Sequence, residues 1–263
     1  MDTGLKGKIA LITGGSSGIG QGVALALAKE GVHIAVASRN PDPEAIQEIE
    51  AQGVRTLRLT TDVSKEDQVV AMVQATIAGL GGLDLYINNA AAHWDEPASK
   101  LTTAGWLNSI HTNLSACVWA CREVSNHFIA RKQGSILIIG STAAWNPLYK
   151  ETSYRVSKGG LKMYMEVLAI ELAPFGIRVN MITPGYFRTR LTAFFGGEQE
   201  KRMLEETPLR RPAQPEEVGA SAALLLSDKL SSYTTGSELV IDGGAKLRPL
   251  PIYSDEEIRQ MSS

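Results

Sequence analysis

The sequence predicts one doubly wound α/β domain built on a mostly parallel sheet of seven strands. Short apolar runs alternate along its 263 residues with segments in which apolar residues recur every three or four positions. This alternation is typical of strands and helices in parallel βαβ units. No linker-like or low-complexity stretch separates two cores, so we expect residues 1–245 to form one domain. Residues 246–263, which contain Pro249 and Pro251, are expected to form a C-terminal tail that could contact another subunit.

The seven predicted strands are short runs rich in apolar residues. The fifth run is apolar on both of its faces, as expected of a strand buried inside a parallel sheet. In chain order the predicted strands are residues 9–12, 33–37, 55–60, 83–87, 135–139, 178–182 and 238–241.

Helical periodicity and end signals define the segments between the strands. Gly31 ends the first helix, residues 64–67 resemble a capping box, and Pro174 with Gly176 ends the helix before the sixth strand. The periodicity breaks between residues 183 and 215, which predicts a long surface excursion. The predicted helices are residues 23–29, 43–52, 64–80, 103–131, 154–172 and 215–227.

Composition excludes several classes of function. The formal net charge of -2, without a block of Lys and Arg, argues against a nucleic-acid-binding protein. The longest apolar runs are too short to span a membrane and the N-terminus lacks an apolar signal segment, so we expect a cytoplasmic protein without a membrane partner. Cys117 and Cys121 lie one helical turn apart with no further ligands nearby, which predicts reduced, buried thiols and no metal site.

A glycine-rich turn follows the first predicted strand and opens a helix. Glycines allow positive φ angles and a close approach of backbone N–H groups to an anion, and the helix N-terminus adds partial positive charge. A diphosphate suits this place, although the spacing departs from Gly-x-Gly-x-x-Gly and a tight turn without a ligand is the alternative. The residues of the turn predicted to bind cofactor are Gly14, Ser16, Ser17, Gly18, Ile19 and Gly20.

A tyrosine and a lysine are placed for acid–base chemistry. Tyr154 and Lys158 lie four residues apart on one helix, hence on one face, where the ammonium would favour the ionised phenol. Such a pair alone is common on helix surfaces. Here Ser141 and Asn89 follow two other strands, at the carboxyl edge of the sheet where α/β folds place ligands.

In these motifs the sequence resembles the short-chain dehydrogenase/reductase family over about residues 5–244. The resemblance implies a Rossmann fold in which Tyr154 is the general acid/base and Ser141 binds the substrate oxygen. It also implies that Lys158 holds the nicotinamide ribose and that Asn113 anchors a water of the proton relay. The motifs are Thr13-Gly14-x-x-x-Gly18-x-Gly20, Asp62, Asn88-Asn89-Ala90, Asn113, Ser141, Tyr154-x-x-x-Lys158, Pro184-Gly185 and Asp242-Gly243.

Two positions depart from the pattern of that family. Ala91 stands where the family most often has glycine, and its methyl group is expected to tighten the pocket. Arg155 is a bulky residue inside the Tyr-Lys motif, and we expect it in solvent or in a subunit contact.

Beyond the glycine turn, the cofactor residues implied by the resemblance are Ser38, Arg39, Asn40, Asp62, Val63, Asn89, Ala90, Ala91, Tyr154, Lys158, Pro184, Gly185, Phe187 and Thr189.

The end of the second strand indicates which cofactor is preferred. Ser38 takes the place of the acidic residue that binds the ribose hydroxyls of NAD, and Arg39 follows it. A guanidinium is a planar, permanently charged partner for a 2′-phosphate. The sequence therefore predicts NADP, with NAD less favoured; a solvated Arg39 is the alternative.

Loops after the strand ends carry the expected substrate wall. Besides Ser141 and Tyr154, the candidates are His93, Trp145, Tyr186 and Arg190, which together suggest a polar substrate. Loop packing is the alternative for His93, and solvation is the alternative for Arg190. Residues 189–206 are predicted to form a lid.

The sequence thus predicts an NADP(H)-dependent oxidoreductase acting on a secondary alcohol or ketone of a sugar, polyol or 3-oxoacyl type. A non-catalytic NADP-binding regulator on the same fold is the alternative. The resemblance also implies a homotetramer. We expect the subunit contacts at residues 103–131 and at the last strand.

Overall fold

The seven strands lie in one sheet, and every pairing within it is parallel. The computed structural model describes residues 2–193, 196–247 and 255–262. The strand order is β3-β2-β1-β4-β5-β6-β7, which confirms the predicted doubly wound fold. The strands are β1 (Ile9–Thr13), β2 (His33–Ser38), β3 (Thr56–Thr60), β4 (Leu85–Asn88), β5 (Gly134–Ile139), β6 (Ile177–Pro184) and β7 (Glu238–Ile241).

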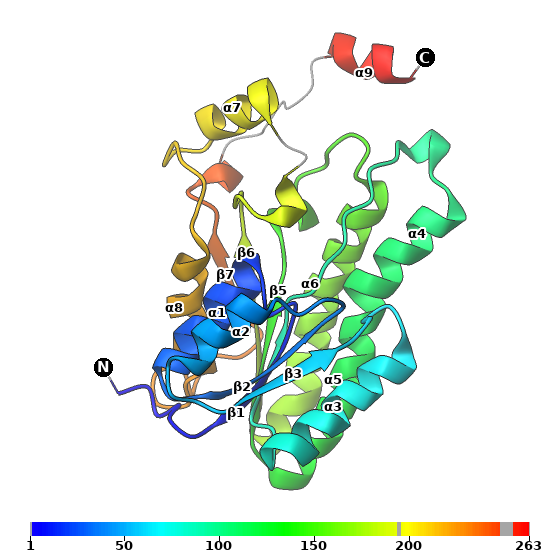
Figure 1. The fold of residues 1–263 in the computed structure, drawn as a ribbon. Coiled ribbons are helices and arrows are strands. Elements are labelled where there is room, and N and C mark those ends of the chain that lie inside the picture. The colour runs from blue at the N-terminus through cyan, green and yellow to red at the C-terminus, as the bar shows by residue number, and fades with distance from the viewer. Residues whose placement is uncertain (1, 194–195, 248–254, 263) are drawn as a thin grey trace.

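Helices cover both faces of the sheet (Figure 1). One face packs against α1, α2 and α8, and the other against α3, α5 and α6. Successive strand residues point to opposite faces, so Leu11 contributes to one core and Ile12 to the other. The helices are α1 (Gly18–Lys29), α2 (Pro43–Glu50), α3 (Glu66–Leu80), α4 (Thr103–Ser109), α5 (Ala116–Arg131), α6 (Thr152–Leu172), α7 (Gly197–Glu206), α8 (Pro215–Leu226) and α9 (Asp255–Ser262).

Strand order reverses at β1, which pairs with β2 on one side and with β4 on the other. The connections that follow β1 and β4 therefore leave in opposite directions, and a crevice opens between them at the carboxyl edge. Two glycines of α1 let the helix approach closely here. A Cβ on Gly20 would lie 2.3 Å from the Gly14 carbonyl oxygen, and one on Gly22 would lie 2.4 Å from that of Pro215.

The predicted helix 103–131 is interrupted. Residues Ile110–Ser115 form a π-helical segment between α4 and α5, which periodicity alone does not show because the axis continues through it. The capping box predicted at residues 64–67 was wrong. Lys65 is the N-cap of α3, and the Ser64 hydroxyl instead donates to Asp62 Oδ1 at 2.8 Å.

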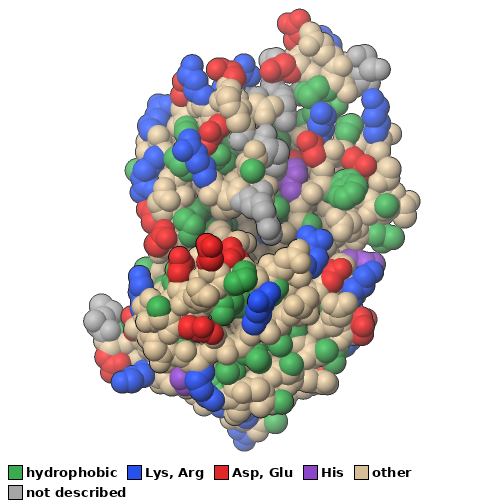
Figure 2. Space-filling view, viewed as in Figure 1, with side chains coloured by type: hydrophobic (Ala, Val, Ile, Leu, Met, Phe, Trp, Pro, Cys, Tyr) green, Lys and Arg blue, Asp and Glu red, His purple; other side chains and the backbone are tan. Residues whose placement is uncertain are grey.

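The first helix, α1, begins at Gly18, five residues before the predicted start at Val23, and most other boundaries shift by one or two residues. The third strand begins at Thr56, the fourth runs from Leu85 to Asn88, and α6 begins at Thr152 rather than Tyr154. The excursion after β6 contains α7, placed above the carboxyl edge in Figure 1, and the tail contains α9. Lys and Arg side chains are interspersed with Asp and Glu over the face shown in Figure 2.

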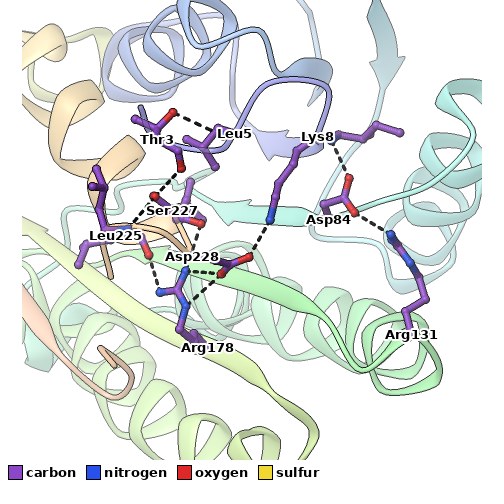
Figure 3. Close-up of polar contacts among 12 residues, drawn as sticks. Thr3, Leu5, Lys8, Asp84, Arg131, Arg178, Leu225, Ser227 and Asp228 are labelled. Carbon is purple, nitrogen blue, oxygen red and sulfur yellow. Dashed lines mark hydrogen bonds and ion pairs between the residues drawn. The ribbon is translucent and has the colours of Figure 1, made fainter. Parts of the chain in front are cut away.

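A polar network closes the opposite, amino edge of the sheet (Figure 3). The buried Arg178 of β6 donates to the carbonyl oxygens of Leu225 at 2.6 Å and Leu226 at 3.1 Å. Its Nη2 also lies 3.0 Å from Asp228 Oδ1, and Asp228 Oδ2 binds Lys8 Nζ at 2.7 Å. Arg178 thus joins β6 to the end of α8 and, through Asp228, to the segment that precedes β1.

We predict that Arg178→Met lowers the free energy of unfolding by about 1 to 3 kcal/mol, because two buried carbonyl groups lose their donor, whereas Asp228 keeps its bond to Lys8. Urea denaturation measures this loss. Arg122→Met is the control, since Arg122 pairs with Glu66 and Glu123 on the surface. Equal losses in the two variants would contradict the role assigned to Arg178.

Candidate active site

The turn between β1 and α1 is packed closely against the segments beside it. Gly14 and Gly18 have φ angles of 69° and 52°, which glycine adopts without strain. Asn89 Nδ2 donates to Thr13 O at 2.9 Å, and the Thr13 hydroxyl oxygen accepts from the backbone N–H of Asn89 at 2.9 Å. A Cβ on Gly14 would lie 2.8 Å from Asn89 Nδ2. The glycines therefore keep a close-packed turn at the N-terminus of α1, which suits a diphosphate.

The ends of β2 and β3 lie beside this turn. The Ser16 and Ser38 hydroxyl groups are 3.3 Å apart, and Arg39 and Asn40 are exposed. Burial opposes ionisation of Asp62, but hydrogen bonds from Ser64 and the positive charge of Arg39 lower its pKa overall. The neighbouring Val63 is buried.

Tyr154, Ser141 and Lys158 converge at the carboxyl edge of β5. Burial raises the pKa of Tyr154 to about 12, and a hydrogen bond with Ser141 opposes this rise. Lys158 Nζ donates to the Ile139 carbonyl at 3.1 Å and lies 5.8 Å from the centroid of the Tyr154 ring. Burial lowers the pKa of Lys158 from 10.5 to about 8. Burial therefore disfavours the ionised phenol in the folded chain, whereas the sequence led us to expect that the Lys158 ammonium would favour it.

Asn113 lies in the π-helical segment and ties two parts of the site together. Its Oδ1 accepts from Ala92 N at 2.8 Å, and its Nδ2 donates to Ala92 O at 2.9 Å and to Ser157 Oγ at 3.0 Å. The Ser157 hydroxyl donates to Tyr154 O at 2.6 Å. Asn113 thus fixes the loop after β4 against α6. Sequence reasoning missed Ser157, although its place directly before Lys158 is a signal that could have found it.

The expected substrate wall is assembled only in part. The His93 ring lies 5.1 Å from the Tyr154 ring, and Lys246 Nζ lies 5.8 Å from the centre of the Trp145 ring. Tyr186 turns toward α7, in the segment predicted to form a lid, where its hydroxyl donates to Glu200 Oε1 at 2.7 Å. Arg190 begins a short 3₁₀ turn (Arg190–Thr192), and its side chain lies outside the described residues.

The base of the predicted lid reaches the glycine turn. Gly185 N donates to Ile241 O at 2.8 Å, which anchors the segment after Pro184 to β7. Phe187 is buried, and a Cβ on Gly18 would lie 3.1 Å from Thr189 Cγ2. Residues 184–189 therefore cross the crevice from β6 to the start of α1.

Arg155 does not lie in solvent, which was one of the two places expected for it, and the other, a subunit contact, stays a prediction. Its Nη2 binds Glu151 Oε2 at 2.8 Å, and its side chain is only 17% exposed. Because Glu151 lies one helical turn earlier, the two side chains meet on one face of α6. Ala91, the other departure from the family pattern, is half-buried beside the Asn89 loop.

Comparison with known proteins identifies the family that has this fold and this site. The family model described as enoyl-(acyl carrier protein) reductase matches residues 14–246, which include the glycine turn and the Tyr154 constellation. The chain belongs to the short-chain dehydrogenase/reductase family. Members of this family are NAD(P)-dependent oxidoreductases, and the chain is an enzyme of this kind that acts on CH–OH or keto groups.

Relatives within the family act on different substrates. The chain is 34% identical over 251 residues to 3beta-hydroxysteroid dehydrogenase 1 of Eggerthella lenta, covering 93% of this chain and 96% of the relative. It is 33% identical to glucose 1-dehydrogenase 2 of Bacillus subtilis, with 93% and 97% covered. It is 34% identical to the 3-oxoacyl-[acyl-carrier-protein] reductase of Chlamydia muridarum, with 93% and 99% covered.

Solved structures of the family share the fold. A short-chain type dehydrogenase/reductase from Mycobacterium marinum matches with a TM-score of 0.86 and 33% identity, over 93% of this chain and 97% of that one. A variant of the actinorhodin polyketide ketoreductase, solved with NADPH, matches with a TM-score of 0.86 and 28% identity, over 90% and 97%.

Membrane spans and metal clusters are both absent from residues 2–193, 196–247 and 255–262. Within these ranges, no helix combines the length and apolar character needed to cross a membrane. The same residues bring together no group of three or more His, Cys, Asp and Glu side chains that could hold a metal ion. Cys117 and Cys121 are free and buried, as expected.

We predict that buried Lys158 makes stability depend on pH. The folded chain releases this proton at about pH 8, whereas the unfolded chain holds it to about 10.5. Raising the pH through this interval therefore favours the folded state, by up to about 3 kcal/mol relative to Lys158→Met. Urea denaturation across the interval measures the difference.

Lys162→Met is the control for this prediction. Lys162 lies one turn later on α6, and its hydrogen bond to Glu166 raises its pKa instead of lowering it. The wild type should show no rise in stability relative to Lys162→Met over the same interval. A flat difference between wild type and Lys158→Met would mean that the Lys158 amine keeps its ordinary pKa.

Proposed function

We propose that this enzyme is NADP(H)-dependent and interconverts a secondary alcohol and a ketone, with Tyr154 as the general acid/base. The observation that carries the proposal is the convergence of Ser141, Tyr154 and Lys158 at the carboxyl edge of β5. A sensor of NADP would need the glycine turn but not this proton-donating group. The constellation therefore favours the enzyme over the non-catalytic regulator.

The residues would divide the work of carbonyl reduction. The Ser141 hydroxyl and the Tyr154 phenol would donate hydrogen bonds to the substrate oxygen as negative charge develops there. Tyr154 would then transfer its proton to that oxygen, and in the reverse direction it would accept it. Lys158, fixed by the Ile139 carbonyl, would place positive charge beside the phenol when its amine is protonated. When bound, NADPH supplies the hydride.

The chain fits a dinucleotide at the crevice. A Cβ on Gly14, Gly18 or Gly20 would lie within about 3 Å of other protein atoms, so the glycines keep the turn compact. The backbone N–H groups at the N-terminus of α1 would then bind the diphosphate. Ser16, Ser17 and Ile19 belong to the same stretch, Asn89 and Thr189 border it, and Asp62 follows β3. We propose that these residues, with the others predicted for the cofactor, hold NADP.

Arg39 is proposed to select NADP over NAD. Its side chain is exposed at the end of β2, where Ser38 replaces an acidic residue, and its charge reaches Asp62. The actinorhodin ketoreductase, a relative with this fold, was solved with NADPH, which supports this preference. A charge-assisted hydrogen bond to the 2′-phosphate contributes about 1.5 to 3 kcal/mol.

We propose that the substrate is an alcohol or ketone of a sugar, polyol or 3-oxoacyl type. Relatives named for glucose and for a 3-oxoacyl group support two of these types, and a relative named for a hydroxysteroid adds a steroid as a candidate. His93 beside Tyr154 and Trp145 beside Lys246 are proposed to line this substrate. Tyr186 is proposed to act as part of the lid because it bonds to Glu200 of α7. The lid motion itself, the role of Arg190 and the cytoplasmic location stay predictions.

An apolar stripe on α6 supports the proposed homo-oligomer. Val156, Met163, Val167 and Ile170 recur at helical spacing and are 44% to 77% exposed. Leu107 of α4 and Val118 of α5 are exposed as well, within the region 103–131 expected at subunit contacts. A tetramer would cover such faces. The contact of the tail with a neighbouring subunit stays a prediction. Within the chain, Arg202 of α7 binds Glu257 of α9 in the tail.

We predict that Tyr154→Phe abolishes turnover while leaving the fold and NADP affinity nearly unchanged, because only the proton-donating hydroxyl is removed. Absorbance of NADPH measures turnover on a panel of a sugar, a 3-oxoacyl thioester and a 3-ketosteroid. Tyr233→Phe removes a hydroxyl from a fully exposed ring and serves as the control. Wild-type turnover by Tyr154→Phe would exclude Tyr154 as the acid.

We predict that Arg39→Ala lowers kcat/KM for NADP about ten- to a hundredfold and leaves NAD nearly unaffected, since only NADP carries the 2′-phosphate. Steady-state kinetics with both cofactors measure the ratio. Arg58→Ala, which removes an exposed charge from the neighbouring strand β3, is the control. An equal loss with both cofactors, or no loss, would refute the role of Arg39.

We predict that Ile170→Glu weakens the oligomer, because it places a charge on the apolar stripe of α6. Analytical ultracentrifugation of wild type and variant measures the change in mass. Leu209→Glu, which alters an exposed apolar side chain outside α6, is the control. A monomeric wild type at micromolar concentration would contradict the proposed oligomer.

A further inference from the structure

Three charged or titratable side chains gather beside Tyr154, on its own helix and on the loop after β4. Glu151 is the N-cap residue of α6 and only 5% exposed. Its Oε2 lies 2.8 Å from Arg155 Nη2, and its Oε1 lies 3.3 Å from His93 Nε2. One buried carboxylate therefore joins two basic side chains from separate segments.

The cluster is in direct contact with the proposed acid. The His93 and Tyr154 rings lie 5.1 Å apart with an interplanar angle of 54°, and Arg155 follows Tyr154 in the chain. Backbone pairing fixes the two segments relative to each other. Glu96 N donates to Lys150 O at 2.8 Å, and Glu96 forms a parallel bridge with Glu151.

Burying the charged cluster of Glu151, Arg155 and His93 lowers the stability of the fold, which indicates that the cluster has a function. Arg155 Nε and Nη1 are buried and have no hydrogen-bond partner among the residues that the structure describes. Buried ion pairs contribute little stability compared with apolar packing, and an unsatisfied buried donor is unfavourable. The pair between Arg155 and Glu151 is thus poorly explained by packing alone.

We propose that Glu151 and Arg155 are positioning residues that set the electrostatic environment of Tyr154 and thereby the pH range of catalysis, with His93 held against the Glu151 carboxylate. This inference rests on the proposed function, in which Tyr154 exchanges a proton with the substrate oxygen. Glu151 and Arg155 act through Tyr154 and do not themselves exchange that proton.

Charges of opposite sign act on the phenol from one helix. The negative charge of Glu151 raises the pKa of Tyr154, whereas the positive charge of Arg155 lowers it. Among the residues that the structure describes, the other groups facing the phenol are the Ser141 hydroxyl from the loop after β5, Lys158 from α6 and His93 from the loop after β4. Removing Glu151 or Arg155 should therefore shift this pKa in opposite directions.

The pH profile of alcohol oxidation tests the inference, since Tyr154 must be ionised to accept the proton and activity falls below its pKa. In Glu151→Gln the acid limb of kcat/KM should move down by about 0.5 to 1 pH unit. In Arg155→Met it should move up by a similar amount, about 0.5 to 1 pH unit. Arg155→Lys keeps the positive charge, so its acid limb should stay at the wild-type position.

Glu166→Gln is the matched control. It removes a carboxylate from another i,i+4 pair of α6, which Glu166 forms with Lys162 away from Tyr154. Its acid limb should stay at the wild-type position. Limbs that move in the same direction in Glu151→Gln and Arg155→Met, or that do not move, would overturn the inference.

A measurement without substrate separates this inference from the proposed function. With NADP bound, the ultraviolet absorbance of tyrosinate is titrated in each variant and in the same variant carrying Tyr154→Phe, and the difference reports Tyr154 alone. Opposite shifts support the cluster, and equal or absent shifts overturn it. Arg155→Gln replaces Arg155→Met if the latter does not fold. Activity retained in Tyr154→Phe would instead overturn the proposed function.

Discussion

The buried ammonium of Lys158 is the constraint on which the site depends. It donates a hydrogen bond to the Ile139 carbonyl at the end of β5, and this bond fixes where α6 crosses the carboxyl edge of the sheet. Burying an amine is unfavourable, and the pKa of Lys158 falls to about 8 in consequence. Tyr154 lies one turn earlier on the same face, so its position follows from that of Lys158.

The rest of the site supports that placement. Asn113 joins Ala92 to Ser157, and Ser157 in turn bonds to the backbone of Tyr154. The π-helical segment around Asn113 widens the helix by one residue at the point where this amide must enter the site. Thr13 and Asn89 hold the glycine turn in the same way, through hydrogen bonds between a side chain and the backbone. Such bonds therefore hold both halves of the crevice.

The strands and the pairing of Tyr154 with Lys158 could be predicted from the sequence because the signals for them are local. Apolar runs located all seven strands, and the spacing of Tyr154 and Lys158 was enough to place them on one helical face. The π-helical segment could not be predicted, since one extra residue in a turn leaves the apolar pattern nearly intact. The burial of Arg155 was also missed, because it depends on Glu151 and on a loop that only the folded chain brings near. The raised pKa of Tyr154 has the same origin, since burial is a property of the whole fold.

We propose that the carboxyl edge between β1 and β5 is a preformed site for NADP and for proton transfer. A crystal structure of the NADP complex is the decisive test. It should place the diphosphate at the turn of Gly14 to Gly20, the 2′-phosphate against Arg39, and the nicotinamide ribose within hydrogen-bond distance of Lys158 and Tyr154. A cofactor bound away from this turn, or a Tyr154 hydroxyl directed away from the nicotinamide, would show that the site is not of this kind.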